Sequence, residues 1–94
     1  HEFESQIKYY LGKIQFLSGT IAEKQNKINL ALNDINKAVA NTINYNKLPD
    51  LFEAEIRLLV KSKKYSKALK EGENYLKTGD ATKGMVKELK LAYK

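Results

Sequence analysis

Residues 49–76 read PDLFEAEIRLLVKSKKYSKALKEGENYL, and this stretch decides the fold. Its apolar residues recur three or four positions apart, which is the spacing of one face of an α-helix. Pro49 and Asp50 are a helix-start signal, and Asp50 and Glu53 are expected to cap that helix. The polar segment 62–64 separates two such helical patterns. The stretch therefore predicts two helices joined by a short turn and packed as a hairpin.

The chain before this hairpin is also helical in its periodicity. Up to Leu17 the apolar positions are Phe3, Ile7, Tyr10, Leu11, Ile14 and Leu17. Ser18 and Gly19 are expected to end that helix, because glycine suits the left-handed position after a helix. Thr20 and Glu23 match a capping box. They predict a second helix from Ile21 to about Ile43.

A loop and a last helix complete the pattern. Segment 44–49 is the clearest loop in the chain, and segment 78–80 breaks it again after the second hairpin. The final helix is predicted from residue 81 or 82 to residue 94. Its apolar face carries Val86, Leu89 and Tyr93. We therefore predict one all-α domain over residues 1–94, with about five helices stacked as antiparallel hairpins.

Composition argues against several classes of function. The 94 residues include no cysteine, and the one histidine is His1. No glycine-rich loop follows a strand, and paired carboxylates such as Glu53/Glu55 and Glu71/Glu73 point in different directions on a helix. We therefore predict no catalysis, no cofactor and no metal site. No apolar run approaches the roughly 18–20 residues that a membrane span requires.

The hairpins resemble tetratricopeptide repeats. A step of 34 residues from Phe52, Ile56 and Leu59 leads to Val86, Lys90 and Tyr93, and two of these three are apolar. This step is the period of the tetratricopeptide family. Further residues of the family pattern are Leu11, Gly12, Gly19, Ile21, Ile28 and Ala31 in the first hairpin, with Lys64 to Ala68 and Tyr75-Leu76 in the second.

This resemblance divides the chain into repeats. Repeat one spans about residues 5–48, with an extended second helix and loop, and repeat two spans about residues 49–80. A terminal helix of the capping type covers about residues 81–94. Small residues are expected where the helices cross closely, at Gly12, Ala31, Ala68 and Gly72. Gly72 stands where the family usually has an aromatic residue, and this difference would either thin the core or admit the side chain of a neighbour.

The resemblance also implies a function: tetratricopeptide domains bind proteins or peptides along a concave groove formed by the first helix of each hairpin. The residues that correspond to the groove are Tyr9, Lys13, Phe16, Glu53, Arg57, Val60, Lys61 and Lys87. Tyr9 and Phe16 are the strongest candidates, since aromatic residues supply much binding energy. The expected partner is another protein, a peptide or a second copy of the chain. The family's Lys/Asn clamp for a terminal carboxylate does not map, because its places are taken by Tyr9, Lys13 and Ala54.

An alternative function follows from the distribution of charge. Residues 1–60 are neutral overall, whereas residues 61–94 hold ten lysines against four acidic residues and supply the whole net charge of +6. A stripe of Lys83, Lys87, Lys90 and Lys94 on the last helix would suit nucleic acid or an anionic surface. Arginine, which specific phosphate readers favour, occurs once.

An alternative architecture is a long coiled coil. Ile7, Ile14, Ile21, Ile28 and Ile35 recur every seven residues, as the seam of a coiled coil requires. Lys24 occupies one intermediate seam position, and segment 18–20 interrupts the run. The hairpin is therefore the favoured prediction.

Overall fold

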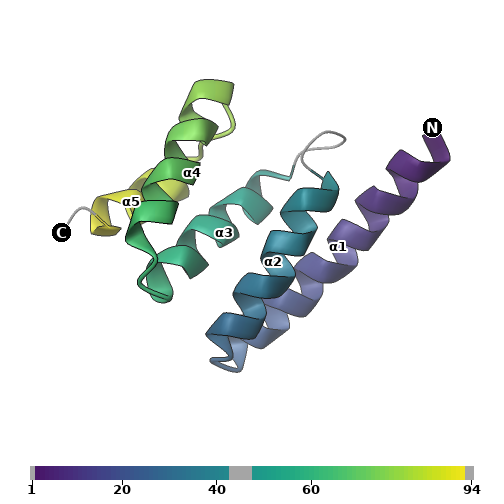
Figure 1. The fold of residues 1–94 in the computed structure, drawn as a ribbon, viewed down its shortest axis with the longest axis horizontal. Helices are drawn as coiled ribbons and strands as arrows, with labels where there is room; N and C mark the ends of the chain where they lie inside the picture. The colour runs from purple at the N-terminus through teal and green to yellow at the C-terminus, as the bar shows by residue number, and fades with distance from the viewer. Residues whose placement is uncertain (1, 43–47, 93–94) are drawn as a thin grey trace.

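Two antiparallel helical hairpins and a last helix make up the fold in the computed structural model, which describes residues 2–42 and 48–92 (Figure 1). The helices are α1 (Glu2–Lys24), α2 (Ile28–Thr42), α3 (Pro49–Lys61), α4 (Tyr65–Thr78) and α5 (Lys83–Ala92). Over the described ranges there is no strand. The prediction of an all-α fold with about five helices is confirmed. The predicted loop residues 44–47, and Tyr93 and Lys94, lie outside the described residues.

Three chain breaks lie where the sequence predicted them. Gly79 ends α4 in the left-handed conformation, with φ of 78°. The turn at 62–64 follows α3, with Lys63 at φ of 62°. Pro49 is the first residue of α3 after Leu48, but no side chain caps this helix. The prediction that Asp50 and Glu53 cap it is therefore wrong. Asp50 lies in the first turn, where its charge is favourable to the helix dipole.

The first break is in a different place from the predicted one. Helix α1 continues through Gly19 to Lys24, and the chain turns at residues 25–27 with Asn26 at φ of 59°. The Thr20 hydroxyl donates a hydrogen bond back to the Phe16 carbonyl at 2.9 Å, within the helix, and Glu23 reaches α3. The predicted capping box is therefore wrong. The extended helix is the first one rather than the second.

Gly12 and Gly19 lie inside α1 because α2 approaches closely at both positions. A Cβ atom at Gly19 would lie 2.7 Å from Cδ1 of Ile35, and one at Gly12 would collide with the methyl group of Thr42. Gly19 therefore serves helix packing and does not end the helix. Ala31 on α2 is fully buried, as predicted for a close crossing.

The core centres on α3, which packs against α2, α4 and α5. Its Phe52 ring is buried and stacks on Tyr75 of α4, with the ring centroids 4.6 Å apart. Met85 of α5 is fully buried, whereas Val86, which the sequence assigned to the apolar face, is partly exposed. Gly72 admits the side chain of Leu89, as predicted.

Among the residues that the structure describes, one carboxylate is buried in this core. Glu55 on α3 is 5% exposed and accepts a hydrogen bond from the Tyr75 hydroxyl at 2.6 Å. Burial raises the pKa of the Glu55 carboxyl above its ordinary value, and the Tyr75 hydrogen bond partly opposes that shift. Burial, followed by the hydrogen bond to Glu55, raises the pKa of Tyr75. The pair links α3 to α4.

Candidate functional site

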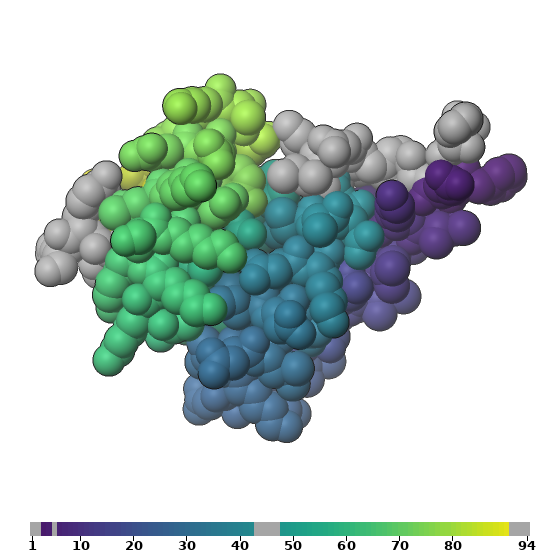
Figure 2. Space-filling view, viewed as in Figure 1, coloured from purple at the N-terminus to yellow at the C-terminus, as the bar shows by residue number. Residues whose placement is uncertain are grey.

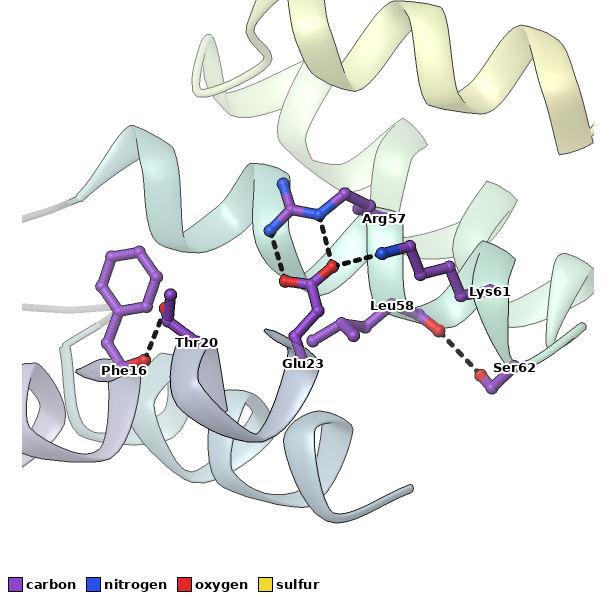
Figure 3. Close-up of polar contacts among 7 residues, drawn as sticks. All are labelled: Phe16, Thr20, Glu23, Arg57, Leu58, Lys61 and Ser62. Atoms are coloured by element: carbon purple, nitrogen blue, oxygen red, sulfur yellow. Dashed lines mark hydrogen bonds and ion pairs between the residues drawn. The ribbon is translucent and has the colours of Figure 1, made fainter. Parts of the chain in front are cut away.

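The predicted groove residues divide between α1, α3 and α5, and the structure brings two of them to one cluster. Arg57 and Lys61 of α3 both hold Glu23 of α1 (Figure 3). The Arg57 guanidinium donates from Nε to Oε2 and from Nη2 to Oε1, each at 2.8 Å. The Lys61 ammonium donates to Oε2 at 2.7 Å. The cluster fastens the end of α1 to α3.

Sequence reasoning missed Glu23 as a member of this cluster, because Glu23 was assigned to a helix cap. The signal for it is its spacing within one unbroken helix. Glu23 follows Phe16 by seven residues and Tyr9 by fourteen, so all three lie on one side of α1. Recognising that spacing depends on knowing that Gly19 does not end the helix.

The charged groups of the cluster are paired with one another within the chain. The hydrogen bond from Arg57, followed by that from Lys61, outweighs the cost of burial and lowers the pKa of Glu23 from its ordinary 4.5 to about 2. The hydrogen bond between Arg57 and Glu23 raises the pKa of Arg57, and the charges of Glu88 and Glu53 add to this effect. Arg57 is therefore surrounded by carboxylates of its own chain and holds the helices together.

Replacing Glu23 with glutamine is expected to lower stability by about 1–2 kcal/mol at neutral pH, after allowance for solvent screening. Because the pKa of Glu23 is lowered on folding, its contribution is present above pH 4.5 and is lost as the pH falls toward about 2. The difference between the Glu23→Gln variant and the wild type should therefore shrink in acid. Urea unfolding at several pH values measures it.

Glu4→Gln is the matched control for this prediction, because Glu4 is exposed on the same helix. It should change the stability by less than about 0.5 kcal/mol. A loss in Glu23→Gln that stays constant down to pH 2 would contradict the assigned role of the ion pairs.

The other predicted groove residues have varied surroundings. Tyr9 is half-buried, and the Lys13 ammonium lies 5.3 Å from its ring centroid. Phe16 and Val60 are partly buried and pack against the core. The remaining two members are Glu53 and Lys87. Glu53 accepts a hydrogen bond from the Thr82 hydroxyl at 2.7 Å, and Lys87 is exposed. Arg57 and Lys61 thus contact α1, and Glu53 contacts the residue that precedes α5.

A different face of α1 has the strongest surface feature. Six large apolar side chains, 56–80% exposed, follow one another along its outer side, and we call them the apolar stripe: Phe3, Ile7, Tyr10, Ile14, Leu17 and Ile21. They are three or four residues apart and extend over about 27 Å of helix. Gly12 and Gly19 lie on the opposite face, against α2. The helix therefore buries its glycines and exposes its large apolar residues.

The structure excludes the coiled-coil alternative. Ile7, Ile14 and Ile21 share the exposed face of α1, but the turn at 25–27 separates them from the isoleucines of α2. Ile35 is buried on α2, so a coiled coil that runs on along the chain is wrong. The periodicity of residues 3–17 predicted a helix correctly and did not show that this face would be exposed. The three isoleucines of α1 that belong to the predicted seam form an exposed surface.

Two further features lie on α4 and α5. Lys83, Lys87 and Lys90 are exposed along α5, and Lys94 lies outside the described residues. A pocket of about 240 Å³ lies between the two helices, lined by Leu69, Glu73, Leu76, Val86, Leu89 and Lys90. Figure 2 shows α4 and α2 forming one broad face of the molecule, with α1 along its edge.

The comparisons give no family to set beside this geometry: no protein-family model, no curated protein and no solved structure matches the chain. Within residues 2–42 and 48–92, no three acidic or histidine side chains gather where they could hold a metal ion. Each described helix is too short or too polar to cross a membrane.

Proposed function

We propose that this chain is a non-catalytic protein-interaction module whose principal contact surface is the apolar stripe of α1. The observation that carries the proposal is the exposure of six large apolar side chains on one helix face. The largest apolar patch of a typical monomer covers about 300–600 Å² and is often functional. Anchors three and four residues apart are the pattern by which one helix binds another.

The helix order supports a tetratricopeptide-like arrangement as part of this proposal. Helix α3 packs against α5 as well as against α4, so the first helix of one unit lies beside the first helix of the next. Ala31 and Ala68 are fully buried, as close helix crossings require. The 23-residue length of α1 departs from the predicted division of repeat one.

The predicted groove residues support partner binding less strongly than the stripe does. Arg57 and Lys61 would have to release Glu23 before they could bind an external carboxylate. Tyr9 and Phe16 are half-buried, whereas Leu17 of the stripe is 65% exposed. The proposed contact surface is therefore the outer side of α1, and the groove is a secondary candidate.

A photo-crosslinking amino acid placed at single positions in cells tests the proposal. At Leu17 on the stripe, we expect a crosslinked product of one defined mass. The matched control is Leu76 on α4, which is 57% exposed and lies off the stripe. A product from Phe16 but not from Leu17 would move the site to the groove. Equal yields at Leu17 and Leu76 would overturn the proposal.

Binding to an anionic surface is the second candidate, favoured by the exposed lysines of α5. Lys83, Lys87 and Lys90 are spaced so that they share one side of the helix. A fluorescent single-stranded oligonucleotide is the probe. Binding through these lysines should weaken steeply between about 50 and about 200 mM salt. It should be lost when all three are replaced by glutamine.

A further inference from the structure

We infer that the partner of the apolar stripe is a second copy of this chain, with the two α1 helices packed antiparallel through their stripes about a two-fold axis at the level of residue 12 along the helix. The inference rests on the proposed function, because it names the occupant of the same surface. It is carried by the sequence of the stripe, by the position of α2 and by the exposed area.

The stripe is complementary to itself in one antiparallel register. Its residues alternate between two columns of a heptad pattern, with Ile7, Ile14 and Ile21 in one column and the other three in the second. In an antiparallel pair, each column packs against the other column of the partner helix. The resulting layers pair Phe3 with Ile21, Ile7 with Leu17, and Tyr10 with Ile14. Each layer forms twice, so all six layers are apolar.

Lys24 distinguishes this register from a parallel one. Lys24 occupies the next seam position after Ile21. A parallel pair would set Lys24 beside the same residue of its partner, and like charges placed together disfavour association. The antiparallel register places Lys24 one layer beyond the last apolar pair. Lys24 therefore disfavours a parallel pair.

The rest of the protein does not obstruct this pairing. Helix α2 packs on the glycine face of α1, opposite the stripe. The two protein bodies would therefore lie on opposite sides of the helix pair. Beside the centre of the stripe, Leu11 is 43% exposed and would lie near the partner's Leu11 across the axis. Lys13 precedes Ile14 beside the stripe, and its ammonium lies over the Tyr9 ring of the same helix.

The available area is sufficient for a dimer. The exposed parts of the six side chains amount to about 700 Å² per chain, close to the ~800 Å² per partner of a standard stable interface. The same patch is used by both copies, so the assembly closes at two chains. A single helix pair of this size is expected to have a micromolar dissociation constant.

Sedimentation velocity between about 5 and about 500 µM is the first test. The wild type should be a dimer at the upper concentrations, and Ile14→Lys should weaken dimerisation by at least ~100-fold. Because Ile14 is 62% exposed, this variant should fold normally, which its circular dichroism checks. Leu76→Lys is the matched control and should leave the dimer intact.

The outcomes separate the inference from the proposed function. A wild type that stays monomeric at every concentration overturns the self-pairing, while crosslinking at Leu17 to another protein would still support the proposed function. A dimer that survives Ile14→Lys and is lost in Leu76→Lys overturns the role of α1.

Disulfide formation tests the register. The chain has no cysteine, so a single introduced cysteine has no other thiol of its own chain with which to form a disulfide. Ile7→Cys and Leu17→Cys chains that carry tags of different mass should form a mixed disulfide when combined, and little disulfide when kept apart. Strong disulfide formation by each variant alone, without preference for the mixed product, would show a parallel pair and overturn the proposed arrangement.

Discussion

Replacing Gly12 with valine is expected to destabilise the protein by about 3 kcal/mol, a large part of the stability of a domain this size. The new side chain would collide with the methyl group of Thr42, which is fully buried on α2. Thr42 has little freedom to move, because its hydroxyl donates a hydrogen bond to the Ala38 carbonyl at 2.9 Å. That carbonyl oxygen would itself lie 3.2 Å from the added Cβ. Urea unfolding measures the loss.

Two variants show whether steric overlap is the cause. Lys8→Val introduces the same residue one turn earlier, at an exposed position of α1, and should change stability by less than about 0.5 kcal/mol. Thr42→Ser removes the obstructing methyl group and keeps the hydroxyl. Combined with Gly12→Ala, it should restore part of the stability that Gly12→Ala loses alone. An absence of coupling between these two changes would contradict the close approach of α1 and α2.

Replacing Tyr75 with phenylalanine is expected to cost about 2 kcal/mol at pH 7, because a buried carboxylate loses its hydrogen-bond donor. Glu55 accepts a hydrogen bond from the Tyr75 hydroxyl at 2.6 Å, and the exposed fraction of Glu55 is only 5%. The aromatic stack on Phe52 should remain, because the ring is unchanged. Thermal or urea unfolding of the Tyr75→Phe variant against the wild type gives the loss directly.

This loss should depend on pH in a defined direction. The folded-state pKa of Glu55 is raised above its ordinary value of 4.5. The free-energy cost of burying its charge is therefore absent below pH 4.5 and grows as the pH rises toward and through the raised pKa. Tyr75→Phe should therefore cost less near pH 4 than at pH 7. Glu55→Gln removes this titration and should reduce the difference between the two pH values. An equal loss for Tyr75→Phe at both would rule out a charged Glu55 as its cause.

The hairpin of α3 and α4 could be predicted from sequence because local signals agree there. Pro49, the polar turn at 62–64 and Gly79 each mark a helix end by their own backbone preferences. The end of α1 could not be predicted in this way. The function of Gly19 depends on the approach of α2, which is a tertiary contact, and the real turn has Asn26 in the conformation that glycine usually adopts.

The candidate surface was visible in the sequence only as a repeat of isoleucines. Heptad spacing shows that Ile7, Ile14 and Ile21 share a face of a helix, but it does not show whether that face is covered. The glycines decide this point, because they allow α2 to pack more closely on their side of α1 than large side chains would. The partner of Glu23 depended likewise on where α3 lies. Both features follow from packing between helices rather than from patterns within one.

The central position of α3 has a consequence for how the molecule forms and comes apart. The main helix contacts join elements that are adjacent or next but one along the chain, which is a topology of low contact order and rapid folding. Among the described helices, α1 and α2 share the most extensive contact, and this pair is joined to the rest mainly through the packing of α2 on α3 and the bonds of Glu23 to α3. We therefore expect the α1–α2 hairpin to open as one unit while α3, α4 and α5 stay together, and hydrogen exchange should show two groups of protection.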